Sequence, residues 1–246
     1  MKLLMDLGNS RCKCAIINNG DFDLIDPISY SKTDRMSTIK SLFDGLKNLS
    51  QVVICTVLGK HINTQLEQFL VSNEIKNIHF INPEIESFEI KLDRYNVKHL
   101  GSDRLAAMVG AHVKFKANIC IVDCGTAITI DALDGNGTHF GGVIFPGVQS
   151  MQNSLLQNTD IDINEESDKY EVFARSTREA IHSGCISAAA GGIQFVINEM
   201  QTKHGMFDKV ILTGGNAEKL LSMLNLNAEY EPTLVLDGLM EISKKL

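Results

Sequence analysis

The chain has 246 residues, a formal net charge of −7, 44% hydrophobic residues and 22% charged residues. At ~150 residues per domain, this length predicts one large α/β domain or two smaller fused ones, with a buried core. The acidic balance disfavours a nucleic-acid backbone or an anionic membrane surface as a partner, and no run reaches the ~18 apolar residues of a membrane span. We therefore expect a cytoplasmic protein with no nucleic-acid or membrane partner.

The N-terminal residues predict two strands joined by a glycine turn. Residues 2–6 and 11–17 are short apolar runs typical of strands, and Gly8-Asn9-Ser10 separates them. A further turn at 18–20 closes the second strand into a hairpin.

The same order of elements returns in the second half of the chain. A strand at 119–123 is followed by Gly125-Thr126, a strand at 127–133, a turn at 134–137 and a strand to Ile144. Asp123 repeats Asp6 at an offset of 117 residues, nearly half of the chain. This pattern predicts an internal duplication, with two similar α/β halves at 1–114 and 115–246 facing each other across a cleft.

Between the repeats, strands are predicted at 51–57 and 77–81, with part of a helix at 66–70. Such alternation is typical of a parallel or mixed sheet covered by helices. Apolar residues at helical spacing from 105 to 113 then predict a helix, with Asp103 at its start.

Two elements are predicted towards the C-terminus. A helix begins at Ser176-Thr177-Arg178-Glu179, which is a capping-box pattern. A strand at 209–212 ends at Thr213-Gly214-Gly215.

The cysteines form no C-x-x-C pair and lie mostly inside apolar strand-like runs, which indicates reduced core thiols and disfavours zinc. They are Cys12, Cys14, Cys55, Cys120, Cys124 and Cys185.

The turn Asp6-Leu7-Gly8-Asn9-Ser10 combines a carboxylate, a glycine and short polar side chains. Its N–H groups could surround phosphate oxygens, while the carboxylate holds hydrated Mg²⁺. Taken alone, it is more often an ordinary turn capped by Asp and Asn. Its repetition as Asp123-Cys124-Gly125-Thr126 favours phosphate binding. The paired turns resemble the phosphate loops of the actin, sugar kinase and Hsp70 superfamily, whose fold has two ribonuclease H-like halves, each a mixed sheet with helices, around a nucleotide cleft.

The resemblance becomes specific over five motifs in order, and the chain resembles the type III pantothenate kinase family from end to end. The motifs are Asp6-Leu7-Gly8-Asn9-Ser10 with Lys13, Gly101-Ser102-Asp103-Arg104, Asp123-Cys124-Gly125-Thr126-Ala127, Gly141-Gly142-Val143-Ile144 with Pro146-Gly147, and Thr213-Gly214-Gly215. This resemblance implies ATP-dependent phosphorylation of pantothenate to 4'-phosphopantothenate, the first step of coenzyme A biosynthesis. It also implies a cytoplasmic homodimer with a shared active site that needs Mg²⁺ and a monovalent cation, K⁺ or NH₄⁺.

The resemblance further implies roles for individual residues. Asp103 is the catalytic base, Asp123 the ligand of the monovalent cation, and Asp6 the ligand of Mg²⁺, through water. The implied pantothenate contacts are Tyr95, Gly101, Ser102, Asp103, Arg104 and, from the neighbouring subunit, Thr177. The implied ATP contacts are Asp6, Leu7, Gly8, Asn9, Ser10, Arg11, Cys12, Lys13, Thr126, Gly214 and Gly215.

Each role has a structural alternative. Asp103 could be the N-cap of its helix, and Thr177 could serve in capping, which Ser176 could also perform. Tyr95 could be an edge-strand aromatic residue, and Arg104 a surface residue; for Asp123 and Thr126 the alternative is turn stabilisation. Two positions depart from the family pattern: Val97 replaces a usual proline after Tyr95-Asn96, and Ile128 replaces a frequent threonine and is expected to point into the strand packing.

Other functions fit parts of the pattern. Another small-molecule kinase of the superfamily, such as a sugar or acetate kinase, would share the phosphate turns but not Gly101-Ser102-Asp103-Arg104. A non-enzymatic regulator like the Bvg accessory factors would share the fold without needing Asp103. An actin-like filament protein would need a polymerising surface that the sequence does not reveal.

Overall fold

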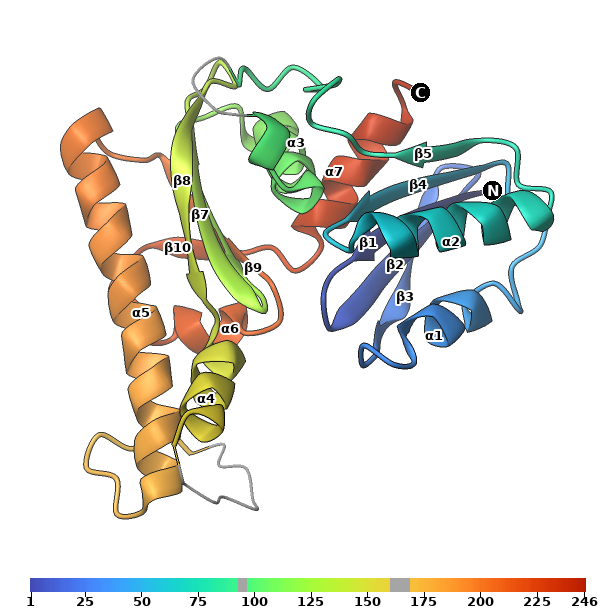
Figure 1. Cartoon of the computed structure of the whole chain (residues 1–246). Coiled ribbons are helices and arrows are strands. Elements are labelled where there is room, and N and C mark those ends of the chain that lie inside the picture. The colour runs from blue at the N-terminus through green and yellow to red at the C-terminus, as the bar shows by residue number, and fades with distance from the viewer. Residues whose placement is uncertain (93–96, 160–168) are drawn as a thin grey trace. The chain divides into compact units, whose positions relative to one another are not determined.

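The computed structural model describes residues 1–92, 97–159 and 169–246 (Figure 1). The chain forms two compact units, the first comprising 1–116, 137–139 and 233–246, and the second 117–136 and 140–232. These units differ from the expected halves chiefly at the C-terminus, because the last helix packs within the first unit.

The sheet of the first unit has the strand order β3-β2-β1-β4-β5. β1 pairs antiparallel with β2 and parallel with β4, while β2–β3 is antiparallel and β4–β5 parallel. β2 and β3 form a hairpin closed by the turn at Asn19-Gly20, where both residues have positive φ. The strands are β1 (Lys2–Leu7), β2 (Arg11–Asn18), β3 (Asp21–Ser29), β4 (Gln51–Thr56) and β5 (Ile78–Phe80).

The sheet of the second unit repeats this arrangement in the order β8-β7-β6-β9-β10. β6 pairs antiparallel with β7 and parallel with β9, which pairs parallel with β10. The expected duplication and the mixed sheets are therefore confirmed. The strands are β6 (Ile119–Cys124), β7 (Ala127–Leu133), β8 (His139–Pro146), β9 (Lys209–Thr213) and β10 (Ala228–Tyr230).

In the first unit, α3 (Ser102–Phe115) and α7 (Leu234–Ser243) pack directly against each other. A Cβ on Gly238 would overlap with the carbonyl oxygen of Ala106, and a Cβ on Gly110 would lie 2.5 Å from that of Leu234. Glycine at both positions lets the two backbones touch, which fixes the axis of α3. The other helices here are α1 (Arg35–Ser41), α2 (Lys60–Ser72) and the 3₁₀ helix η1 (Val97–His99).

The second unit holds α4 (Val148–Gln157), α5 (Thr177–His204) and α6 (Ala217–Leu221). By length and composition alone α5 could cross a membrane, with a mean hydropathy of 1.4 over its most apolar window. Its inner residues, among them Ile186, Ala189 and Ile193, are nevertheless part of the hydrophobic core against β6 and β7. This burial is typical of a core helix in a globular protein.

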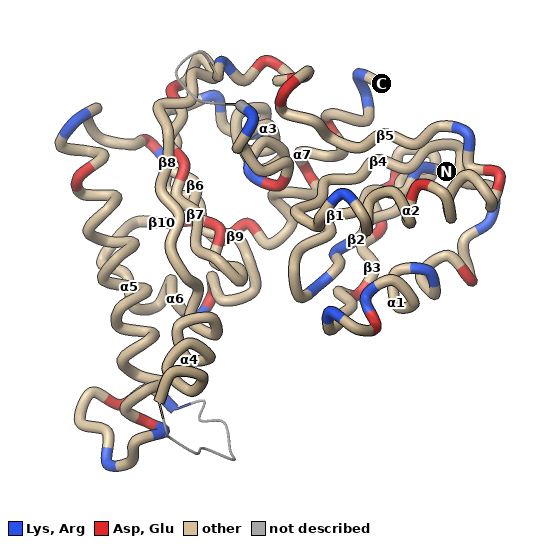
Figure 2. Tube along the Cα trace, in the orientation of Figure 1, with Lys and Arg blue, Asp and Glu red and all other residues tan. Residues whose placement is uncertain are grey.

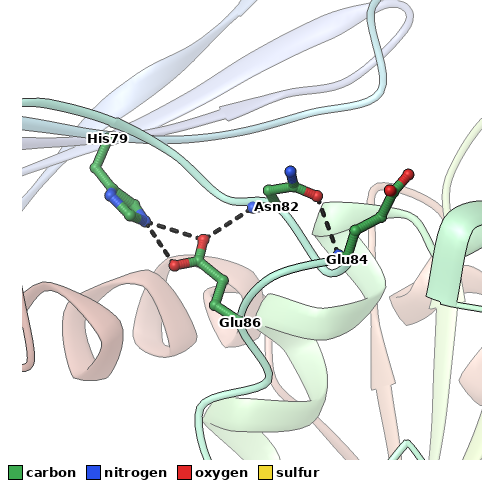
Figure 3. A network of polar contacts seen from close by, with 4 residues as sticks. All are labelled: His79, Asn82, Glu84 and Glu86. Atoms are coloured by element: carbon green, nitrogen blue, oxygen red, sulfur yellow. Dashed lines mark hydrogen bonds and ion pairs between the residues drawn. The ribbon is translucent and has the colours of Figure 1, made fainter.

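A polar network closes the loop after β5 (Figure 3). The Nε2 atom of His79 lies 3.0 Å from both carboxylate oxygens of Glu86. Glu86 also accepts the Asn82 N–H at 2.8 Å, and Asn82 Oδ1 accepts the Glu84 N–H at 3.0 Å. Through His79 these contacts attach the loop at 82–86 to β5.

All six cysteines are free and buried, as expected for core thiols. Ile128 is buried in the core of the second unit, as expected for a residue of the strand packing. Lys and Arg are interspersed with Asp and Glu in both units (Figure 2).

Candidate active site

The first glycine turn lies between β1 and β2, and hydrogen bonds to its backbone hold its conformation. Gly8 N–H donates to the carbonyl of Arg11 at 3.0 Å. The Tyr30 hydroxyl lies 2.7 Å from the Gly8 carbonyl and 3.1 Å from that of Arg11. Arg35 Nη2 donates to the Asn9 carbonyl at 2.7 Å. With its carbonyls held in this way, the turn leaves Asn9, Ser10 and Arg11 exposed, where they could contact phosphates.

Asp6 is the next-to-last residue of β1 and lies between two cross-strand neighbours, Lys13 on β2 and Cys55 on β4. The Cys55 thiol donates to Asp6 Oδ1 at 3.4 Å. Burial raises the pKa of Asp6 to about 6, and the charge of Asp103 adds to this, while Lys13 and the Cys55 hydrogen bond lower the pKa. The partly buried carboxylates of Asp6 and Asp103 repel each other. A bound cation would reduce this repulsion.

Asp103 is the second residue of α3, so it lies at the start of that helix as predicted. The N-cap is Gly101 and not Asp103, which rules out the N-cap interpretation, although Asp103 Oδ1 does accept the Arg104 N–H at 2.8 Å. The Ser102 hydroxyl accepts the Thr56 N–H at 2.8 Å and donates to the Thr56 carbonyl at 3.0 Å. The first turn of α3 is thereby fastened to the end of β4, beside Cys55.

Gly101 gives the Asp103 carboxylate its space. A Cβ at position 101 would overlap with Asp103 Oδ1, although the backbone there (φ −65°, ψ 140°) suits any residue.

Arg104 is only 5% exposed, so it is not a surface residue. Tyr95 lies outside the described residues.

The second glycine turn joins β6 and β7 and is one residue tighter than the first. Gly125 N–H donates to the Ala127 carbonyl at 3.1 Å. The Thr126 carbonyl accepts from Gly147 N–H at 3.0 Å and from the Ser150 hydroxyl at 2.6 Å. A Cβ on Gly147 would overlap with the Gly125 carbonyl, so glycine lets the start of α4 lie against this turn.

Asp123 is the next-to-last residue of β6, as Asp6 is of β1, and its cross-strand neighbours are Thr129 on β7 and Thr213 on β9. Gly214 follows with φ +93°, and a Cβ there would overlap with Asp123 Oδ1 and lie 2.7 Å from the backbone of Cys124. Gly214 is therefore packed against the Asp123 carboxylate.

A small polar cavity of about 120 Å³ lies between α4, α5 and α6 in the second unit. His182, which is 8% exposed, contacts Gln152 Nε2 at 2.9 Å and Lys219 Nζ at 3.0 Å. This network could not be predicted from the sequence, because its members come from three helices and share no local motif.

Thr177 is the exposed first residue of α5. Ser176 is the N-cap, and its hydroxyl accepts the Glu179 N–H at 3.2 Å. Capping thus falls to Ser176, which leaves the Thr177 hydroxyl available for another partner.

The raised pKa of Asp6 predicts a pH-dependent stability in metal-free protein. The folded state holds the Asp6 proton more tightly than the unfolded state, so the free energy of unfolding falls as pH rises from about 4 through about 6, by up to about 3 kcal/mol. Asp6→Asn should therefore be about 1–3 kcal/mol more stable than wild type at pH 7.5 and gain about a third of that at pH 4.5. Urea unfolding at both pH values measures this. A variant less stable than wild type at pH 7.5 would contradict it.

The two units, each a mixed sheet with an aspartate and a glycine turn near the end of its first strand, define an actin-like fold. Solved structures agree on the fold. A Campylobacter jejuni protein described as a Baf family transcriptional activator matches with TM-score 0.62 at 23% identity, covering 99% of this chain and 98% of that one. The EutJ protein of Carboxydothermus hydrogenoformans matches with TM-score 0.57 at 11% identity, over 98% and 88%.

The sequence comparisons identify the family. A family model described as type III pantothenate kinase matches residues 2–199. The type III pantothenate kinase of Nitrosococcus oceani is 32% identical over 99% of this chain and 94% of its own. That of Thiobacillus denitrificans is 30% identical, over 99% and 96%. The chain belongs to the type III pantothenate kinase family.

Proposed function

We propose that this chain transfers the γ-phosphate of ATP to the primary hydroxyl of pantothenate, with Asp103 as the base that accepts the hydroxyl proton. The observation that carries the proposal is the placement of Asp103: its carboxylate occupies the space left by Gly101, on a helix start fastened to β4 by Ser102. Phosphoryl transfer requires mainly positioned groups and charge stabilisation, and this anchoring supplies the first.

Asp6 is the residue we assign to Mg²⁺, through water. The fit rests on its half-buried carboxylate, which feels the charge of Asp103 and has a raised pKa. Mg²⁺, when bound, supplies positive charge to the phosphate oxygens of ATP. The chain's own contribution is to aim Asp6 between Lys13 and Cys55, with Leu7, Gly8, Asn9, Ser10, Arg11 and Cys12 completing the first ATP turn.

In the second unit, we assign Asp123 to a monovalent cation, and Thr126, Gly214 and Gly215 to ATP. Pantothenate is assigned to Gly101, Arg104 and Tyr95, with Ser102 supporting the site through its bonds to Thr56. A buried guanidinium such as that of Arg104 suits a carboxylate. The acidic net charge and the free, buried thiols fit a cytoplasmic enzyme.

We also propose a homodimer in which Thr177 completes the site of the partner subunit. Asp103→Asn and Thr177→Trp should each be inactive alone. After mixing and subunit exchange they should recover about a quarter of wild-type activity, because half of the dimers are mixed and each holds one intact site. Light scattering should give twice the 27.1 kDa chain mass. A monomer that is active at assay concentration, or no recovery on mixing, would contradict the shared site.

The function is tested by incubating the pure protein with ATP, Mg²⁺, K⁺ and a panel of hydroxylated acids and sugars, and analysing the products by mass spectrometry. Phosphopantothenate should be the dominant product. Phosphorylation of a sugar or of acetate instead would point to another kinase of the fold, and no phosphorylated product would refute the proposal. The Baf family resemblance stands at the level of fold and does not favour a regulatory function.

A further inference from the structure

The two aspartates of the duplicated turns have different neighbours. In the first unit, Asp6 lies between Lys13 and Cys55, which we call the Asp6 row. In the second unit, Asp123 lies between Thr129 and Thr213, which we call the Asp123 row. Residues paired across neighbouring strands present their side chains to the same face of the sheet. The Asp6 row therefore includes its own cation, Lys13, whereas the Asp123 row holds a carboxylate and two hydroxyls.

Thr213 is the unusual member of the Asp123 row. It is 0% exposed, and its hydroxyl oxygen has no hydrogen-bond partner among the residues that the structure describes. A buried hydroxyl without a partner destabilises the fold, and native proteins leave few such groups without a reason. Its register partner is Asp123, so the hydroxyl lies on the same face of the sheet as that carboxylate.

We propose that Thr213 is a ligand of a monovalent cation held beside Asp123, with the Thr129 hydroxyl on the opposite flank. The proposal rests on the assignment of Asp123 to a monovalent cation, and it names the residue that completes that site. A bound cation would give the Thr213 oxygen the partner that it lacks among the described residues.

The donor chemistry favours a cation of K⁺ type over Mg²⁺. Mg²⁺ requires a near-ideal octahedron, retains most of its waters and is bound through carboxylates or phosphates. A neutral hydroxyl fixed on a β-strand cannot adjust to that geometry. Larger monovalent ions accept neutral oxygens from hydroxyls and carbonyls in place of their hydration shell.

The test is the cation-dependent rise in melting temperature at constant ionic strength, in KCl, NH₄Cl, NaCl, MgCl₂ or tetramethylammonium chloride, with and without a non-hydrolysable ATP analogue. For wild type, K⁺ and NH₄⁺ should raise the melting temperature above the value in tetramethylammonium. Thr213→Val keeps the shape but lacks the hydroxyl, and should raise the half-saturating K⁺ concentration about tenfold or more. Thr213→Ser, which keeps the hydroxyl, should stay near wild type.

Cys55→Val is the matched control, because Cys55 occupies the equivalent position in the Asp6 row. It should alter the baseline melting temperature but not the K⁺ increment. An unchanged K⁺ response in Thr213→Val, with the response abolished in Asp123→Asn, would overturn the role of Thr213 while leaving Asp123 as the ligand. A wild type that responds equally to all five salts would overturn the site itself. If the K⁺ response depends on Thr213 but no phosphopantothenate forms, the cation site stands and the proposed function fails.

Discussion

Asp103→Asn should lower kcat for phosphopantothenate formation by ~10²–10⁴, the usual contribution of a general base. The amide has nearly the shape of the carboxylate but cannot accept the hydroxyl proton. Ser102 should still fasten α3 to β4 through Thr56, so the position of the side chain should change little. ATP affinity, measured by calorimetry, should stay near that of wild type. A variant with near-normal kcat would show that Asp103 only stabilises the first turn of α3.

The matched control for this prediction is Asp237→Asn. Asp237 lies in the first turn of α7 in the same unit, where its carboxylate accepts the Thr233 hydroxyl at 2.9 Å. The amide oxygen of Asn can still accept the Thr233 hydroxyl, so removal of the charge should cost stability of at most about 1 kcal/mol and leave kcat within about twofold. An equal loss of kcat in both variants would mean that helix stability, rather than proton transfer, is being measured.

Gly214→Ala should lower kcat/KM for ATP by about 10²-fold, because small displacements of positioning groups have effects of this size. The added Cβ would overlap with Asp123 Oδ1 and crowd the Cys124 backbone, at a φ of +93° that alanine rarely adopts. Both the glycine turn and the Asp123 carboxylate should be displaced.

Gly205→Ala separates the effect of backbone strain from that of the steric overlap with Asp123. Gly205 has a similar φ of +89° at the end of α5, but a Cβ there would meet nothing within 4 Å. This variant should show the backbone strain alone, as a loss of about 1–3 kcal/mol in unfolding free energy with near-normal kinetics. If Gly205→Ala lowers kcat/KM as much as Gly214→Ala, the packing of Gly214 on Asp123 is not what matters.

Strong local patterns made much of the fold predictable. The strands of both sheets around the glycine turns follow their apolar runs, and α5 begins at its capping box. α7 was not predicted, because its run Leu234–Ser243 is short and mostly apolar, includes Gly238 and has no side-chain N-cap hydrogen bond. The short α1 and α4 have no side-chain N-cap hydrogen bond and few buried residues, so their sequences contain little helix signal.

The site was predictable where its residues lie within a motif. Asp6, Asp103 and Asp123 stand at the predicted strand ends and helix start, although their roles remain proposals. The pairing of these aspartates with Cys55 and Thr213 was not predictable, although Thr213 belongs to the Thr213-Gly214-Gly215 motif. Cys55 and Thr213 lie 49 and 90 positions from their aspartates and neighbour them only across the parallel pairs β1–β4 and β6–β9. Tyr30 and Arg35, which brace the first turn, are likewise separated from it in the sequence.

Transfer of phosphate to the primary hydroxyl of pantothenate is measured most directly by phosphorus NMR of a reaction containing wild-type protein, ATP, Mg²⁺, K⁺ and pantothenate. We expect ADP and a phosphomonoester to appear in equal amounts, with the ester phosphorus coupled to the methylene protons of the primary carbinol. Production of ADP and free phosphate without an ester, or an ester on the secondary hydroxyl, would contradict the assignment of this chain as a pantothenate kinase that acts through Asp103.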